Sequence, residues 1–582
     1  MSTAKTLFDK IWDQHVVDEL GDGMQLMFVD RHLLHELSGH RGQLEIARRG
    51  LKMRNPELAV GSMDHVVSTA PGSRGGNAPW ADKIIETFRV EGKKSGMKIY
   101  DIGQDGQGIV HVVGPELGFT LPGTLLVCGD SHTCTHGALG SLAWGIGTTE
   151  LVHVLATQTI VQQKPKTMRV DFRGIPARGV VAKDLILALI GKIGTAGGMG
   201  YAVEYAGEAI RGLGAEGRMT VCNLSIELGA KVGMIAPDQT TYDYLKGRRH
   251  APAGAQWEQA LAHWKTLPSD ADAKFDIEHA IDCAALAPQI TWGTSPEDVI
   301  GVDGRIPDNK PEALAYMGLS AGKPIAGTKV DRVFIGSCTN SRLPDLRAAA
   351  EVVKGRKAAK HVRAWVVPGS WRIKQDAEAE GLHEVFKQAG FEWREAGCSM
   401  CVAANGDYVA PLERCVSTSN RNFVGRQGPQ ARTPGQPGDG GGRCDCRRDC
   451  RCAGSLNGTL QETFRNSGAV PAEKRRHGFH HPRRALHRHA ERTARQLRLR
   501  DGAFPQGRQP QPGFRPQPAA LSRRADPDLR RILRHRQLAR NGGMGARRHG
   551  HPLPDRALLR ADFLRQLLPE WPVADCSFFF CC

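Results

Sequence analysis

The sequence predicts an α/β fold with largely parallel sheets over residues 1–433, followed by a segment of different character over residues 434–582. Two observations predict this division. Short apolar runs that end in Gly, Ser or Asp alternate with longer runs of helical periodicity, which is typical of parallel strands joined by crossover helices. The alternation stops near residue 433, and an Arg-, Pro- and Gly-rich sequence without sustained periodicity takes its place.

Individual strands and helices can be predicted within residues 1–433. The clearest, in chain order, are a strand at "TLLVCGD" (124–130), a helix at "VAKDLILALIGKIG" (181–194), a strand at "DRVFIGS" (331–337), a helix at "SRLPDLRAAAEVVKG" (341–355) and a strand at "VRAWVVPGS" (362–370). Polar clusters follow two of these strands: Asp130-Ser131-His132 after the first and Cys338-Thr339-Asn340 after the second. One such cluster can be no more than an N-cap and a turn. Several of them at the carboxyl ends of parallel strands predict a ligand site there.

The net charge of the chain, +17, is confined to its last part. Residues 434–582 hold 29 basic and 13 acidic residues, a net charge of +16, whereas residues 1–433 hold 49 basic and 48 acidic residues, a net charge of +1. The first 433 residues therefore have the balanced composition of a soluble globular protein. The charge of the whole chain does not predict a nucleic-acid partner for that body.

The amino-terminal stretch "MSTAKTLFDKIWDQHVVDEL" contains acidic residues and no long apolar run, so we expect neither a signal peptide nor a transit peptide. No stretch has the roughly 18 apolar residues that a membrane span needs. The eight cysteines of residues 1–433 do not follow the spacing of a small secreted domain. These features predict a protein of the reducing cytoplasm.

Four cysteines suggest a metal centre, and their spacing leaves its kind open. Cys398 and Cys401 are separated by two residues, Cys338 lies sixty residues earlier, and Cys415 follows fourteen residues after Cys401. Four thiolates could bind a structural zinc ion, although Cys338 has no neighbouring partner of its own. Three thiolates could instead hold an iron–sulfur cube, which leaves one iron open to bind a substrate oxygen.

Several long motifs carry a family resemblance. They are "DRHLLHE" (30–36), "MDHVVST" (63–69), "CGDSHTCTHGALGSLAWGIGTTE" (128–150), "GKIGTAGGMGYAVEYAG" (191–207), "MTVCNLSIELGAKVGMIAPD" (219–238), "GSCTNSR" (336–342), "GCSMC" (397–401) and "STSNRNFVGRQG" (417–428). Together they resemble the aconitase superfamily, and within it the large subunits of bacterial 3-isopropylmalate dehydratases. The resemblance runs through residues 1–433 and implies a three-domain α/β/α core with an aconitase-like catalytic body.

The resemblance also implies roles for single residues. It makes Cys338, Cys398 and Cys401 the ligands of one [4Fe-4S] cluster per chain and leaves Cys415 out. It pairs acids with histidines as catalytic groups: Asp64 with His65, Asp130 with His111, and Glu227 with His132. The substrate-binding positions that it implies are Asp30, Ser131, Asn223, Asn340, Asn420, Arg421 and Arg426. An arginine suits a dicarboxylate substrate because its planar fork donates two parallel hydrogen bonds to a carboxylate.

The implied reaction is a dehydration and a rehydration that interconvert 2-isopropylmalate and 3-isopropylmalate, a step of leucine and branched-chain amino acid biosynthesis. In the family the carbon-bound proton is removed by a serine of a "GSSRE" motif, which this enzyme type carries on a separate small subunit. The motif does not occur in this sequence, so we expect a heterodimer and an inactive isolated chain. Two alternatives remain: a sister hydratase for homoaconitate or a methyl-substituted malate, and a zinc- or RNA-binding protein that uses the four cysteines and the Arg-rich tail.

Residues 434–582 break the family pattern, and four interpretations of them differ. "CDCRRDCRC" (444–452) suggests metal binding, and the arginines suggest a nucleic-acid arm or a disordered tail. The favoured interpretation is an out-of-frame translation. Codons for residues 434–443 shifted by one base allow Leu-Ala-Ser-Pro-Ala-Met-Ala-Ala-Ala, and those for "RQLARNGGMGA" (536–546) allow Gly-Ser-Ser-Arg-Glu. Both products resemble family motifs, so we predict a non-homologous and disordered tail.

Overall fold

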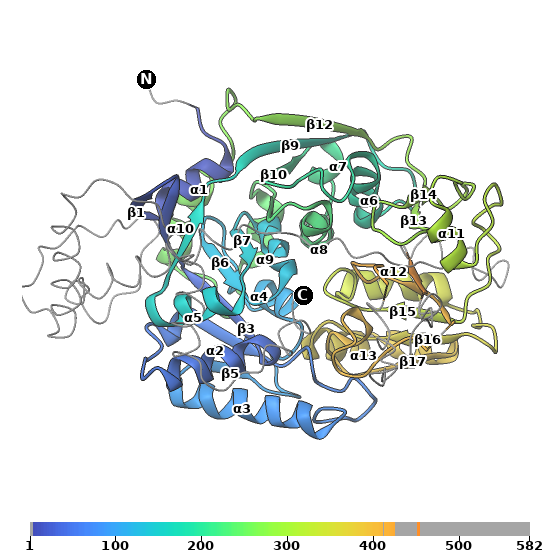
Figure 1. Cartoon of the computed structure of the whole chain (residues 1–582), viewed down its shortest axis with the longest axis horizontal. Helices are drawn as coiled ribbons and strands as arrows, with labels where there is room; N and C mark the ends of the chain where they lie inside the picture. The colour runs from blue at the N-terminus through green and yellow to red at the C-terminus, as the bar shows by residue number, and fades with distance from the viewer. Residues whose placement is uncertain (1–3, 411, 425–450, 454–582) are drawn as a thin grey trace, which may run out of the picture. The chain divides into compact units, whose positions relative to one another are not determined.

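A computed structural model describes residues 4–410, 412–424 and 451–453, all of which belong to one compact unit. Three parallel sheets form its framework, and two small antiparallel sheets accompany them (Figure 1). This arrangement confirms the predicted α/β class with largely parallel sheets. Among the described residues, no helix is long and apolar enough to cross a membrane.

The first parallel sheet has the strand order β5-β4-β3-β6-β7. Its strands are β3 (Arg31–His35), β4 (Ala59–Ser62), β5 (Lys98–Tyr100), β6 (Leu125–Cys128) and β7 (Leu142–Gly145), and its helices are α2 (Glu36–Arg48), α3 (Pro79–Ser95), α4 (Val110–Glu116) and α5 (Thr148–Thr157). Helix α2 packs between α3 and α5 (Figure 1). Helix α3 begins with a proline at its first turn and ends at Gly96, whose positive φ of 77° terminates it.

The second parallel sheet has the order β11-β10-β9-β12. Its strands are β9 (Lys166–Arg173), β10 (Tyr201–Ala206), β11 (Val232–Met234) and β12 (Ile277–Asp282), with α6 (Ala182–Ile193), α7 (Glu208–Arg211), α8 (Ala215–Asn223), η3 (Leu224–Leu228), α9 (Gln239–Leu245) and α10 (Ala255–Trp264). The predicted helix at 181–194 is α6, and it starts with the Asp184 carboxylate accepting the Val181 N–H. One continuous apolar core joins this sheet to the first.

The third parallel sheet has the order β17-β16-β15-β18-β19 and a separate apolar core. Its strands are β15 (Arg332–Ile335), β16 (Arg363–Val366), β17 (Phe391–Trp393), β18 (Arg414–Ser417) and β19 (Arg451–Ala453), with α11 (Pro311–Met317), α12 (Leu343–Val353), α13 (Trp371–Ala379), α14 (Leu382–Gln388) and η4 (Ser399–Cys401). Strand β19 belongs to the segment predicted to be disordered; the rest of that segment, and the predicted metal motif up to residue 450, lie outside the described residues.

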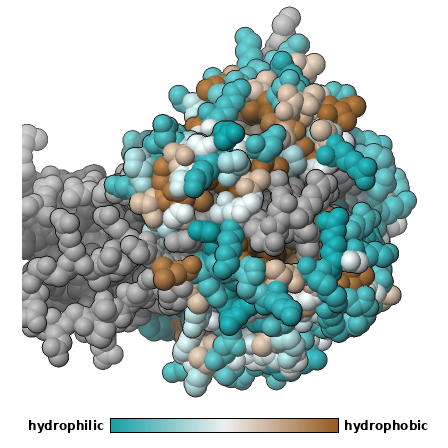
Figure 2. Space-filling view, turned by 90° about the vertical axis from the view of Figure 1, so that its right-hand side faces the viewer, coloured by the Kyte–Doolittle hydropathy of each residue, from teal (hydrophilic) through white to brown (hydrophobic). Residues whose placement is uncertain are grey.

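The antiparallel sheets are short. They contain β1 (Val16–Gly21), β2 (Met24–Phe28) and β8 (Thr159–Gln163), and β13 (Gln289–Thr291) with β14 (Val299–Gly301); the remaining elements are α1 (Leu7–His15), η1 (Pro56–Leu58) and η2 (Ser131–Leu139). On the face drawn in Figure 2, hydrophilic residues cover most of the described surface and apolar residues stand in small groups among them. The large apolar side chains therefore lie mainly in the cores.

Candidate active site

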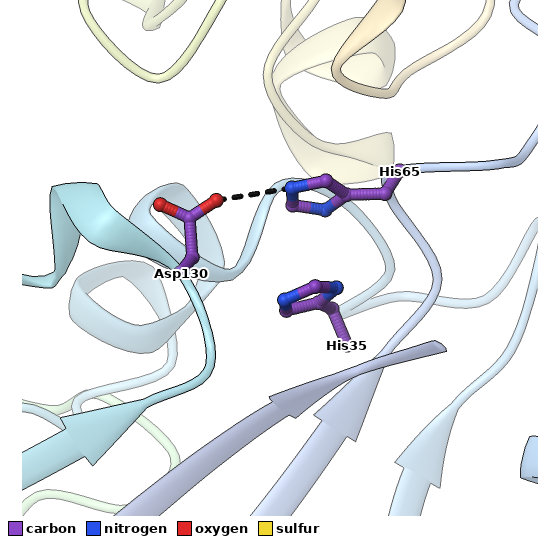
Figure 3. A group of neighbouring side chains, drawn as sticks. All are labelled: His35, His65 and Asp130. Carbon is purple, nitrogen blue, oxygen red and sulfur yellow. Dashed lines mark hydrogen bonds and ion pairs between the residues drawn. The ribbon is translucent and has the colours of Figure 1, made fainter. Parts of the chain in front are cut away.

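A group of histidines surrounds the carboxylate of Asp130, which follows β6 at its carboxyl end. The carboxylate lies 3.0 Å from His65 Nε2, 3.0 Å from His111 Nε2 and 3.6 Å from His132 Nδ1. Figure 3 shows it pointing toward the His65 ring. Burial opposes the charge, but these imidazoles outweigh it and hold the pKa of Asp130 well below its usual range. The sequence paired Asp130 with His111 alone, whereas the structure makes it a partner of three histidines.

His65 follows β4 and is held between two carboxylates. Its Nδ1 forms a short hydrogen bond with Asp64 Oδ1, while its Nε2 faces Asp130. Burial disfavours the imidazolium, yet the charges of Asp64, Cys398 and Asp130 raise the pKa of His65 well above its ordinary value. The loop itself is fixed by Glu36, whose carboxylate accepts the backbone N–H groups of Asp64 at 2.9 Å and His65 at 2.7 Å. His65 is therefore a buried imidazole that is held in one orientation and favours its protonated form.

His35 and Glu36 belong to this site, although the sequence analysis did not select them. The His35 ring stacks on the His65 ring with centroids 4.0 Å apart (Figure 3). Burial and the neighbouring His65 charge lower the pKa of His35 to about 4, and burial beside Asp64 raises that of Glu36 to about 7. His35 is the last residue of β3 and Glu36 follows it, so the rule applied to the ends of the other strands would have found them.

The third predicted pair, His132 with Glu227, forms the other side of the site. His132 Nε2 lies 2.8 Å from Glu227 Oε1, and Arg421 donates from Nε to the same oxygen at 2.6 Å. Although burial acts in the opposite direction, Arg421 and His132 lower the pKa of Glu227. Arg421 also donates from Nη2 to Ser131 Oγ at 2.9 Å, and its Nη1 has no partner among the described residues. That nitrogen suits a carboxylate ligand.

His111 is connected to a second, deeper histidine. Its Nδ1 lies 3.1 Å from His136 Nε2, and His136 Nδ1 lies 2.7 Å from Thr120 Oγ1. Burial, with the nearby positive charges of His111 and Arg342, lowers the pKa of His136 well below its usual range. His136 is therefore a neutral ring that holds the His111 ring in place through this contact. It lies inside the "CGDSHTCTHGALG" motif, but nothing in that motif alone distinguishes it from a core histidine.

Three thiols meet beside these histidines. Cys338 follows β15, Cys398 precedes η4 and Cys401 is its last residue; all three are buried and reduced. Cys398 Sγ lies 3.9 Å from His65 Nδ1. Asn223 and Asn420 donate amide N–H groups to Cys338 Sγ at 3.1 and 3.3 Å. Such donors favour a thiolate.

The three thiols of Cys338, Cys398 and Cys401 fit a cationic cluster. The adjacent Cys401 thiol and burial raise the pKa of Cys338 well above its ordinary value, and burial raises that of Cys398. Three thiolates therefore cannot coexist here unless positive charge is placed among them, as a bound metal centre would do. Cys415 stands apart, because its buried side chain packs in a separate apolar cluster with Phe334, Val367, Met400 and Val409. The four-cysteine zinc site that the spacing left open is not formed.

The other predicted substrate-binding residues differ in their placement. Asn340 follows Cys338 by two residues and donates to Asp345 at 3.1 Å, while its buried Oδ1 has no partner among the described residues. Asp30 lies away from the site: it precedes β3, at the sheet edge opposite His35, and its carboxylate bonds His15 at 2.5 Å. This position does not favour the substrate contact predicted for Asp30. Arg426 lies outside the described residues.

The chain resembles known proteins over most of its length. The model of the aconitase family (aconitate hydratase) matches residues 9–434. A curated relative, the 3-isopropylmalate dehydratase large subunit 1 of Bradyrhizobium diazoefficiens, is 62% identical over 440 residues, covering 74% of this chain and 92% of the relative. A solved structure, the holo-form of aconitase X from Thermococcus kodakaraensis, is 12% identical to this chain with a TM-score of 0.39. The alignment covers 68% of this chain and 84% of the aconitase X chain. The family match and the relative together show that this chain belongs to the aconitase family.

Proposed function

We propose that this chain is the large subunit of a hydro-lyase that interconverts 2-isopropylmalate and 3-isopropylmalate in leucine biosynthesis. One observation supports this proposal most strongly: three buried thiols lie beside two acid–histidine systems at the carboxyl ends of parallel strands. The relative supports the choice of substrate, because it is a 3-isopropylmalate dehydratase large subunit at 62% identity. A cytoplasmic location is part of the same proposal.

Cys338, Cys398 and Cys401 would hold one [4Fe-4S] cluster. Held by three thiolates, such a cluster supplies a Lewis acid at the iron that lacks a protein ligand. The surrounding residues supply proton transfer and binding. Oriented by Asp64 and Asp130, the charged His65 donates a proton to a leaving hydroxyl group, and Arg421 Nη1 binds a substrate carboxylate.

The proposal includes a partner subunit. Removal of a proton from carbon needs a base, and the histidines here that face carboxylates are better suited to donate protons. The family assigns the base to a serine of a "GSSRE" motif, which is not in this sequence. The relative is named as a large subunit, which supports a small subunit as the source of that base.

The experiment that tests the proposal combines metal analysis with a substrate comparison. The full chain is purified without oxygen, its iron and zinc are measured, and the small subunit of an isopropylmalate dehydratase is added. We expect about four irons per chain and conversion of 2-isopropylmalate only after the addition. Stoichiometric zinc without iron contradicts the cluster. Homoaconitate and a methyl-substituted malate are assayed in parallel. Faster turnover of either one would identify the enzyme as a sister hydratase instead.

We further propose that the catalytic body ends at residue 433 and that residues 434–582 are an out-of-frame addition. The match to the family model, which ends at residue 434, supports this boundary. Limited proteolysis of the full chain should leave a fragment ending near Arg432 that binds as much iron as the intact chain, because Cys338, Cys398 and Cys401 all precede that point. A protease-resistant tail, or iron lost with the tail, contradicts the proposal. Sequencing the DNA across codons 430–440 tests the frame directly.

A further inference from the structure

Lys183 is a buried cation that the proposed reaction does not use. It lies in the first turn of α6, and only 2% of its surface is exposed. Both placements are unfavourable, because burial penalises an ammonium group and the amino-terminal end of a helix repels positive charge. Although Asp184 acts in the opposite direction, burial lowers the pKa of Lys183 to about 7. A position this costly calls for a compensating contact.

The compensating contacts include two backbone carbonyls. The Lys183 ammonium donates to Thr418 O at 2.9 Å and to Ser419 O at 2.7 Å. These residues begin the loop that leaves the carboxyl end of β18. The loop then presents Asn420 and Arg421, the two side chains that face the thiols and Glu227.

The loop has other anchors, but they hold different points. Thr418 Oγ1 accepts the Gly336 N–H at 2.9 Å, which fixes the start of the loop to the end of β15. Asn422 donates to Gly293 O at 3.3 Å and to Ser295 O at 3.2 Å, which fixes its far end. Lys183 is the anchor that comes from α6, beside the second sheet, and it bonds the carbonyl directly before Asn420.

We propose that Lys183 is a positioning residue, which clamps residues 418–419 so that Asn420 covers the cluster thiols and Arg421 reaches Glu227 and Ser131. The inference deepens the proposed function. It predicts that loss of the clamp exposes Cys338 and Cys401, which touch Asn420 at 3.3 and 3.5 Å. Cys398 should be affected less, because its thiol faces His65.

The chain provides a matched control on the same helix. Lys192, in the last turn of α6, also donates to a backbone carbonyl, Ala280 O at 2.9 Å, but this contact lies on the exposed side of β12. Lys183→Met and Lys192→Met therefore remove the same chemical group and the same kind of hydrogen bond. They differ in whether the carbonyl belongs to the loop beside the thiols.

The test measures thiol accessibility in the iron-free full chain. Each variant is treated with iodoacetamide under native conditions, and alkylation is followed at each cysteine by peptide mass spectrometry. We expect Lys183→Met to accelerate alkylation of Cys338 and Cys401 about tenfold or more, with Cys128 and Cys222 in the core unchanged. Lys192→Met should leave the rates unchanged. Lys183→Arg, which keeps charged donors, should stay within about threefold of the unmodified chain.

Three results would overturn the inference: unchanged rates at Cys338 and Cys401 in Lys183→Met, equal acceleration at Cys128 and Cys222, or no rescue by arginine. The second result would mean that Lys183 holds the fold as a whole. Because alkylation needs neither cluster nor partner subunit, failure here leaves the proposed function standing. Conversely, a chain that binds no iron could still show the clamp. In the loaded heterodimer, Lys183→Met should raise KM more than it lowers kcat, since Arg421 is the displaced substrate contact.

Discussion

The carboxylate of Asp407 should be the most sensitive structural position near the thiols. It accepts hydrogen bonds from Arg394 Nη2, Ser399 Oγ and Asn405 Nδ2, each at 2.8 Å, and a short one from Thr69 Oγ1. Arg394 and Asp407 are 5% and 6% exposed. Ser399 stands between two cluster cysteines with a positive φ of 49°, a conformation that a non-glycine residue adopts only when its surroundings hold it.

The substitution Asp407→Asn keeps the shape but has one acceptor oxygen where the carboxylate has two. Whichever way the amide turns, its NH₂ group faces a donor: the Arg394 guanidinium on one side, or the Ser399, Asn405 and Thr69 groups on the other. At least one buried donor then loses its partner, which costs about 1–3 kcal/mol, and the Arg394 charge loses its buried counterion. Breaking a buried ion pair from one side costs about 3–5 kcal/mol when the other charge is left without any partner. Arg394 keeps the partly exposed Glu392 as a second partner, so we expect the lower end of that range, about 3 kcal/mol.

Amide hydrogen exchange of the full chain measures this effect locally. We expect peptides that cover residues 391–407 to exchange about 10²–10³-fold faster in Asp407→Asn. Asp105→Asn is the control, because Asp105 also pairs with arginine side chains, those of Arg249 and Arg372, but on the surface. An exposed pair is worth less than about 1 kcal/mol, so its own peptides should change by less than about tenfold. Equal changes in the two variants would refute the reasoning.

Three further outcomes are expected. Cys398→Ser should abolish iron binding and Cys415→Ser should preserve it, measured as iron per chain after anaerobic purification; iron loss in the Cys415 variant would indicate a fourth ligand. His132→Ala should keep the cluster but lower turnover by the heterodimer by about 10²–10⁴-fold, and near-normal rates would remove His132 from catalysis. Although burial opposes it, Asp30 raises the pKa of His15 above the ordinary value of 6.5. The ion pair therefore contributes its full stabilisation below pH 6.5, and this contribution is lost as the pH rises through the raised pKa. Urea unfolding between about pH 6 and 9 should show this loss, and His15→Gln should flatten it.

The sequence was most informative where chemistry follows a strand end. The runs before Asp130 and Cys338 became β6 and β15, and the polar residues after them form the site. The same rule explains why Asp30 lies apart from the other predicted site residues. Asp30 and His35 share one motif, but a strand rises about 3.3 Å per residue, so five residues carry the chain from one edge of the sheet to the other. A motif match therefore identifies a segment, and strand direction decides which of its residues reach the ligand.

The contacts that hold the site in place were beyond prediction for a different reason. Within their segments, Lys183 and Arg394 look like ordinary exposed charges on a helix and beside a strand. They are important because each is buried against a loop that is distant in sequence. Lys183 bonds a loop 235 residues away along the chain, and Arg394 bonds one 13 residues away. Neither periodicity nor spacing carries that information, because burial of a charge depends on which segments the tertiary fold brings together. The catalytic groups can thus be found by motif, whereas the residues that set their geometry must be found by asking which buried charges have backbone or carboxylate partners next to the site.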